Sequence, residues 1–97
     1  MNQAPYRLLY TAEARKNIDK LDPSIRKVVR RAIESLALNS TRGIPLAYEL
    51  AGLHSLRTSD YRIIYRVRGN ELVIIVVAVG YRREIYQRLR QLKSIRF

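Results

Sequence analysis

Apolar residues recur at helical spacing in the first half of the chain and at strand spacing in the second half. The clearest helical stripe begins at Ile25 and continues at offsets 3, 4, 7, 8 and 11, with basic residues on the other face. Asp22 and Pro23 precede it as a predicted N-cap and first helical residue. The pattern predicts a helix that ends near Asn39.

A shorter helix and a strand are predicted before this stripe. Residues 6–10 (YRLLY) predict a short first strand. Thr11 is a predicted N-cap for a helix over residues 12–20, with Glu13 in its first turn, where a carboxylate suits the helix dipole. Residues 12–39 together predict an antiparallel helix pair.

The second half favours strands. Residues 48–57 predict a strand interrupted by a glycine, and residues 61–68 alternate so that Tyr61, Ile63, Tyr65 and Val67 share one face. A Gly-Asn turn leads to residues 72–79, which are apolar on both faces, as in a central strand covered on both sides. Residues 83–93 predict a last short helix, which could cover part of the second face.

These elements predict an α+β fold in a single domain over residues 1–97. The expected architecture is a small antiparallel β-sheet with an N-terminal helix pair packed on one face and a short C-terminal helix. Three antiparallel strands are expected in the second half, because they follow one another through short turns.

The charge points to a polyanionic partner. The chain carries 19 Lys and Arg residues against 8 Asp and Glu residues, a net charge of +11 on 97 residues. Most of the basic residues are arginines, which bind phosphate bidentately and stack on bases. This composition favours nucleic acid over an anionic membrane. Charge for solubility alone is the simpler alternative.

Composition excludes several classes of site. The chain has no cysteine and one histidine, so a disulfide framework, a thiol nucleophile and the usual zinc sites are excluded. The acidic residues are scattered, which disfavours a two-metal nuclease, and no cofactor is expected. The chain shows no signal peptide and no membrane-spanning apolar run, so we expect a soluble cytoplasmic protein.

Arginines around one tyrosine form the candidate site. If the last strands pair in order, Arg57, Arg62 and Arg82 approach one another at one end of the sheet, and Tyr86 follows Arg82 by about one helical turn. Fixed guanidinium groups stabilise charge that develops on a phosphodiester, and RNA supplies its own 2′-hydroxyl nucleophile. In the simpler alternative Tyr86 packs in the core, and Arg82 pairs with an acidic neighbour.

Further basic residues extend the candidate interface. They lie after the last strand, on the strand of residues 61–68 and on the basic face of the second helix, and the predicted RNA-binding set is Arg57, Arg83, Arg66, Arg30 and Arg31. Solvation alone also explains Arg66 and the helix residues. His54 between two leucines is expected to be a half-buried structural residue.

Three segments resemble the RelE/ParE superfamily of toxins from type II toxin–antitoxin systems. They are LAGLHSLRTSDYRIIYRV, the apolar strand after it, and VGYRREIYQRL, and the similarity extends to the helix stripe DPSIRKVVRRAIESL. They are most similar to the RelE-like branch, whose members cleave mRNA in the ribosomal A site. The resemblance implies a small antiparallel sheet with a helix pair on one face.

The resemblance also implies site residues. The arginine of the DYR element falls on Arg62, the arginine after the glycine of the last strand on Arg82, and the tyrosine of the last helix on Tyr86. In RelE-like enzymes these positions serve phosphate stabilisation, leaving-group protonation or base orientation. The type member of the branch carries lysines where this chain has Leu53 and Ser55.

Three functions follow from the resemblance. The first is a ribosome-dependent, metal-independent mRNA endonuclease that inhibits translation and contacts mRNA and ribosomal RNA. The alternatives are a ParE-like inhibitor of DNA gyrase and a degenerate, non-catalytic toxin that binds its antitoxin and co-represses its operon. All three imply a cognate antitoxin with an acidic or amphipathic segment, and operator DNA bound indirectly through that antitoxin.

Overall fold

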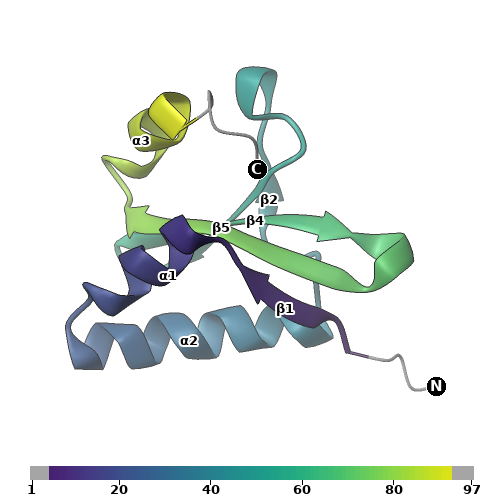
Figure 1. The fold of residues 1–97 in the computed structure, drawn as a ribbon, viewed down its shortest axis with the longest axis horizontal. Coiled ribbons are helices and arrows are strands. Elements are labelled where there is room, and N and C mark those ends of the chain that lie inside the picture. The colour runs from purple at the N-terminus through teal and green to yellow at the C-terminus, as the bar shows by residue number, and fades with distance from the viewer. Residues whose placement is uncertain (1–4, 93–97) are drawn as a thin grey trace.

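The computed structural model describes residues 5–92, which form a five-stranded sheet and three helices (Figure 1). The elements in chain order are β1 (Arg7–Tyr10), α1 (Ala12–Asp19), α2 (Pro23–Leu38), β2 (Ile44–Pro45), the 3₁₀ turn η1 (Tyr48–Leu50), β3 (His54–Thr58), β4 (Tyr61–Arg68), the 3₁₀ turn η2 (Gly69–Glu71), β5 (Val73–Tyr81) and α3 (Ile85–Leu92).

The sheet is mixed, with strand order β1-β5-β4-β3-β2. Strands β3, β4 and β5 pair antiparallel, as the sequence predicts, and the short β2, which the sequence does not predict, pairs antiparallel with β3. Strand β1 pairs in parallel with β5. The expectation of a wholly antiparallel sheet is therefore wrong for β1. The chain between β1 and β2 forms the helix pair, and β5 returns beside β1 in the same direction.

Helices cover both faces of the sheet (Figure 1). The helix pair α1–α2 packs on one face, here called the helix-pair face, where its buried side chains Ile18, Val29 and Ile33 meet Ile63 and Val76 of the sheet. Helix α3 lies on the other face, here called the α3 face, and its apolar side completes a second cluster: Ile85, Leu89, Ile64, Val77, Ala78, Leu50 and Leu53. The predicted cover for the second face is confirmed.

A β-bulge in β5 changes which residues face which layer. Tyr65 pairs with Val76 and Ile64 pairs with Ala78, so Val77 is the extra residue. Val77 and Ala78 both pack in the cluster beneath α3, although they are consecutive. The bulge thus sends the side chain of Val79 back to the helix-pair face.

Where β1 ends, side chains of α1 and its N-cap supply hydrogen-bond partners for the backbone of β5. The Thr11 hydroxyl donates to the carbonyl of Val77 at 2.6 Å and also accepts from the N–H of Ala14, which confirms Thr11 as the N-cap of α1. The N–H of Val79 donates to Asn17 Oδ1 at 3.0 Å. The helix therefore replaces a neighbouring strand at these two backbone groups.

The same network reaches α3 through Glu13. Glu13 Oε2 accepts from Asn17 Nδ2 and from Arg88 Nε, each at 2.8 Å. The hydrogen bond from Arg88 is the main cause that lowers the pKa of Glu13 below its ordinary value, and the bond from Asn17 adds to it. Partial burial acts in the opposite direction. A chain of hydrogen bonds thus joins the backbone of β5, α1 and α3.

Two local predictions are corrected. The strand predicted over residues 48–57 begins only at His54 and ends at Thr58 as β3, because Tyr48 takes a left-handed φ of 57° and the chain turns through η1. Asp22 is the N-cap of α2 and Pro23 its first residue, as predicted, although the Asp22 side chain makes no capping hydrogen bond. The Gly-Asn turn is a 3₁₀ turn that ends in a left-handed Leu72 at φ 54°. Position 93 of the predicted last helix lies outside the described residues.

No helix within residues 5–92 combines the length and the apolar character that a bilayer crossing requires.

Tyr65 links the sheet to the loop after α2. Its side chain is fully buried, and its hydroxyl donates to the carbonyl of Ser40 and accepts from the N–H of Gly43, each at 3.0 Å. A Cβ at Gly43 would lie 2.5 Å from the Tyr65 hydroxyl, so only glycine fits there. Burial raises the pKa of Tyr65, which keeps the phenol protonated as the donor to Ser40.

We expect Tyr65→Phe to lower the free energy of unfolding by about 1–3 kcal/mol, because it removes the hydrogen-bond partner of the partly buried Gly43 N–H and of the partly buried Ser40 carbonyl. Urea unfolding followed by circular dichroism measures the change. Tyr48→Phe is the matched control, since Tyr48 is 91% exposed and should lose nothing. Equal stability of the two variants would contradict this account of Tyr65.

We expect Glu13→Gln to lower the free energy of unfolding at pH 7 by about 0.5–1 kcal/mol, the scale of a partly exposed ion pair. Because the folded-state pKa of Glu13 is lowered, its contribution is complete above the unfolded-state pKa and is lost as the pH falls through the folded value. The difference between variant and wild type should therefore shrink towards about pH 3. Urea titrations at both pH values check this, and a difference independent of pH would refute it.

Candidate functional site

Strand pairing places two predicted arginines directly opposite each other. Arg57 on β3 pairs with Arg62 on β4, and Arg62 pairs in turn with Gly80 on β5. The row lies at the end of the sheet where β3 and β4 join through residues 59–60. The predicted approach of Arg57 and Arg62 is therefore present in the structure.

The row lies on the α3 face of the sheet. Ile63, the next residue after Arg62, packs on the helix-pair face, and side chains alternate along a strand. A Cβ at Gly80 would meet Ile85 Cδ1 at 2.8 Å, which places that side of Gly80 against α3. Because Gly80 adds no side chain, α3 can approach the sheet beside the arginine pair.

The two arginines are like charges at opposing positions, an arrangement that destabilises a sheet when nothing compensates it. The Arg62 guanidinium turns to the chain reversal, where Nη1 donates to the carbonyl of Tyr61 at 2.9 Å and to that of Ser59 at 3.3 Å. Arg57 is exposed. Among residues 5–92, no acidic side chain forms an ion pair with either arginine, so the row carries positive charge at the surface of the sheet.

Arg82 lies beside this row but outside any helix. Its backbone N–H donates to the carbonyl of Asp60 at 2.8 Å, and its Nε lies 3.7 Å from Asp60 Oδ1. Helix α3 begins only at Ile85, so the spacing of about one helical turn between Arg82 and Tyr86 does not place them on one helix. Arg83 is exposed in the same turn.

Tyr86 contacts the sheet through its hydroxyl. The phenol oxygen lies 3.0 Å from Ser55 Oγ, and Ser55 is only 4% exposed. Ser55 precedes Arg57 by two residues on β3, so the two side chains share a face about 7 Å apart. Tyr86 therefore packs against the cluster beneath α3, as the simpler alternative expects, and also makes a polar contact with Ser55.

The neighbours of Ser55 have structural roles. Leu53 is buried beneath α3, and His54 lies on the opposite face, where its ring stacks on Tyr65 with centroids 5.3 Å apart. The expected structural role of His54 agrees with this stacking. Neither residue brings a charged group to the arginine row.

The remaining predicted RNA-binding residues lie away from the row. Arg66 follows Arg62 by four residues on β4, and its guanidinium lies near Gly52, at the other end of the α3 face. Its Nε is buried and has no hydrogen-bond partner among residues 5–92. Arg66 is therefore a partly buried residue at the far end of the face rather than part of the arginine row.

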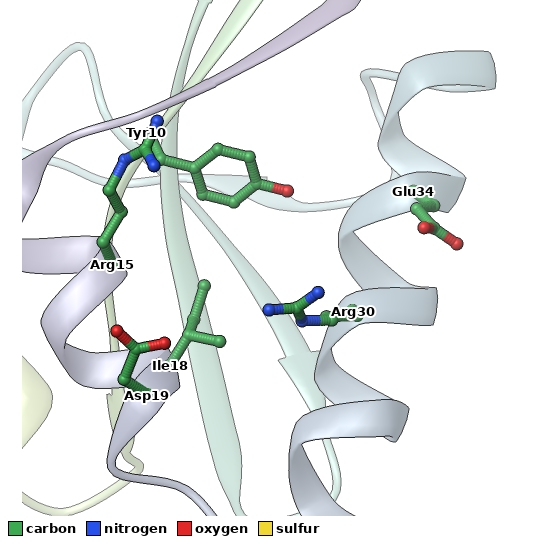
Figure 2. Close-up of a pocket in the computed structure, with 6 residues that line it drawn as sticks. All are labelled: Tyr10, Arg15, Ile18, Asp19, Arg30 and Glu34. Carbon is green, nitrogen blue, oxygen red and sulfur yellow. The ribbon is translucent and has the colours of Figure 1, made fainter.

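Arg30 and Arg31 lie on α2, on the opposite side of the sheet. Arg30 lines a cavity of about 250 Å³ between the helices, together with Tyr10, Arg15, Ile18, Asp19 and Glu34 (Figure 2). Burial raises the pKa of Tyr10 at this cavity, although the nearby Arg30 opposes it. The structure thus separates the α2 arginines from Arg57 and Arg62.

Sequence reasoning missed the groups that hold α3 in place. Arg88 bonds Glu13 across 75 positions of the chain, and Arg90 Nε bonds Glu49 Oε1 at 2.8 Å on η1. Charge spacing within one helix gives no signal for such long-range pairs. In the part of the chain that the structure describes, no cluster of His, Asp or Glu side chains could hold a metal ion.

A family model described as the ParE toxin of type II toxin–antitoxin systems, parDE, matches residues 8–86. Toxin RelG of Mycobacterium tuberculosis is 37% identical over 86 residues, which cover 87% of this chain and 99% of that protein. The mRNA interferase toxin RelE of Escherichia coli K12 is 32% identical over 89 residues, which cover 84% of this chain and 90% of that protein.

Solved structures show the same fold. The RelBE2 toxin–antitoxin complex of Mycobacterium tuberculosis contains a chain with a TM-score of 0.77 and 31% identity, and the match covers 84% of this chain and 95% of that one. A mutant of Escherichia coli toxin RelE in the free state gives a TM-score of 0.72 at 25% identity, with 95% and 99% covered.

Proposed function

Since the chain belongs to the RelE/ParE superfamily, the toxins of type II toxin–antitoxin systems, we propose that it is an endoribonuclease that cleaves mRNA in the ribosomal A site. The proposal takes its substrate from similarity to proteins named as mRNA interferases. It takes its site from the arginine row and Tyr86.

The opposed pair Arg57–Arg62 is the observation that supports this proposal most. Two guanidinium groups at paired positions repel each other, and a phosphodiester between them would convert the repulsion into attraction. The pair lies on the α3 face of the sheet. Ser55 lies on the same face, where it contacts Tyr86. A single RNA phosphate bound at the arginine row could thus contact both the guanidinium groups and the Tyr86 phenol.

The proposed reaction is a transesterification within the RNA. The 2′-oxygen attacks the adjacent phosphorus, the bond from phosphorus to the 5′-oxygen breaks, and the products are a 2′,3′-cyclic phosphate and a 5′-hydroxyl. Arg62 and Arg82 would neutralise the charge on the non-bridging oxygens. Tyr86 would orient the 2′-hydroxyl or accept its proton, and the leaving oxygen takes up a proton.

The present contacts of both arginines are weak enough for a phosphate to replace them. The Arg82 and Asp60 side chains are 43% and 56% exposed, and exposed ion pairs contribute about 0–1 kcal/mol. Arg62 donates only to backbone carbonyls of the turn. An anionic phosphate is a stronger acceptor than a neutral carbonyl.

The second candidate is ParE-type inhibition of DNA gyrase. The family model that matches is named for ParE, and Leu53 and Ser55 stand where the RelE type member has lysines. Neither leucine nor serine carries a cationic group, and both side chains are buried, so neither could replace a lysine at the RNA. The absence of lysines at these two positions also fits a toxin that only binds its antitoxin.

An antitoxin is the proposed partner in each case. The solved relatives include toxin–antitoxin complexes from Mycobacterium tuberculosis and Escherichia coli. A net charge of +11 suits a partner with an acidic or amphipathic segment, and operator DNA would be bound through that partner. Ribosomal RNA would be the second polyanion that the basic surface contacts.

We expect Arg82→Ala and Tyr86→Phe each to lower the rate of mRNA cleavage on programmed ribosomes by about 10²–10³, because each removes a group from the transition state. Single-turnover cleavage at saturating toxin measures the chemical step. Mapping of RNA 5′-hydroxyl ends shows whether the cuts share one position within codons.

Arg68→Ala is the matched control for charge, since Arg68 lies at the far end of β4 and pairs with Glu71. Full cleavage by folded Arg82→Ala and Tyr86→Phe variants would contradict the site. Growth arrest without RNA cuts, together with inhibition of purified gyrase, would replace the nuclease by the second candidate.

Arg30 and Arg31 should act on binding rather than on chemistry, because α2 lies across the sheet from the arginine row. We expect the double variant Arg30→Ala/Arg31→Ala to raise KM about tenfold with kcat unchanged, and to weaken the salt dependence of ribosome binding. Steady-state cleavage at two salt concentrations measures both. A fall in kcat at constant KM would assign these residues to the reaction instead.

A further inference from the structure

Helix α3 owes its position to contacts rather than to its own stability. It has eight residues, Ile85–Leu92, and a helix of this length is not stable alone in water. Ile85 and Leu89 are buried on the sheet and lie four positions apart, so they anchor the helix along a single line. Tyr86 adds a contact with the same cluster and with Ser55 on one flank of this line, so the opposite flank needs its own contact to stop the helix rolling.

Two ion pairs oppose rolling of the helix. Arg88 and Arg90 are two positions apart and therefore project from nearly opposite sides of the helix. Arg88 bonds Glu13 of α1 and Arg90 bonds Glu49 of η1, each at 2.8 Å. The helix is therefore held from both flanks.

Glu13 is the more buried of the two anchors. Its side chain is 17% exposed, against 37% for Glu49. Asn17 fixes the same Oε2 atom that accepts from Arg88, and Asn17 in turn accepts from the backbone N–H of Val79. Glu13 and Asn17 thus link Arg88 to the backbone of β5, the strand that also carries Gly80.

Tyr86 depends on this anchor because of its place on the helix. It precedes Arg88 by two residues, and its hydroxyl meets Ser55 Oγ at 3.0 Å. Tyr86 and Arg88 lie on opposite flanks of the Ile85–Leu89 line, so a roll of α3 that releases Arg88 from Glu13 also changes the position of the phenol against Ser55. Misplacement of a reacting group by about 1 Å can cost a rate factor near 100.

We infer that Glu13 is a positioning residue for Tyr86, which it holds against Ser55 by way of Arg88. The inference rests on the proposed function only for its effect on cleavage. Glu13 lies on α1 and acts through another residue, so its loss should change the rate of the chemical step and leave substrate binding intact.

The test uses the full-length protein with ¹³C-labelled tyrosine, Tyr86 being assigned with the Tyr86→Phe variant. We expect Glu13→Gln and Arg88→Gln to shift the Tyr86 ring signal and to lower kcat about tenfold with KM unchanged. Arg88→Lys keeps a cationic donor and should restore most of the rate. Glu71→Gln is the matched control, since it neutralises a glutamate of an exposed ion pair remote from α3.

Two results would overturn the inference. One is an unchanged Tyr86 signal with unchanged kcat in Glu13→Gln. The other is an equal loss of rate when Glu13→Gln is added to Tyr86→Phe, because an effect through Tyr86 must vanish in its absence. If wild type cuts no RNA at all, the proposed nuclease fails, and the ring signal alone decides whether Glu13 positions Tyr86.

Discussion

Strand β5 needs hydrogen-bond partners along both edges, but β1 ends at Tyr10 and leaves the residues after Val76 without a neighbouring strand. Buried backbone groups without partners are costly, so this edge must be satisfied by other means. Thr11 and Asn17 satisfy it from α1. The position of α1 on the edge then allows Glu13 to reach across to Arg88, and α3 takes its place from there.

Pattern and capping rules predict the elements well where the physical signal is local. The stripe of α2, the Thr11 cap and the alternation on β4 depend on neighbours within a few residues, and the structure agrees with each. The parallel pairing of β1 and the 3₁₀ turn at Tyr48 depend on distant packing. The bulge at Val77 is invisible in the sequence, because every residue around it is apolar and no change of period can be detected.

The candidate site could be predicted in part for the same reason. Short turns between β3 and β4 and an antiparallel return of β5 are enough to bring Arg57 beside Arg62. The contact between Tyr86 and Ser55 depends on how α3 lies on the sheet, which long-range pairs determine. The separation of the α2 arginines from the row depends on which face the helix pair covers.

Strand β2, at the end of the sheet, has only two residues, Ile44 and Pro45. Proline has no N–H to donate, so a second extended chain would find little to bond along this edge. A longer strand with the same exposed isoleucine would be a template for edge-to-edge aggregation. The brevity of β2 thus favours a molecule that stays dispersed at high concentration, even though Ile44 is 65% exposed.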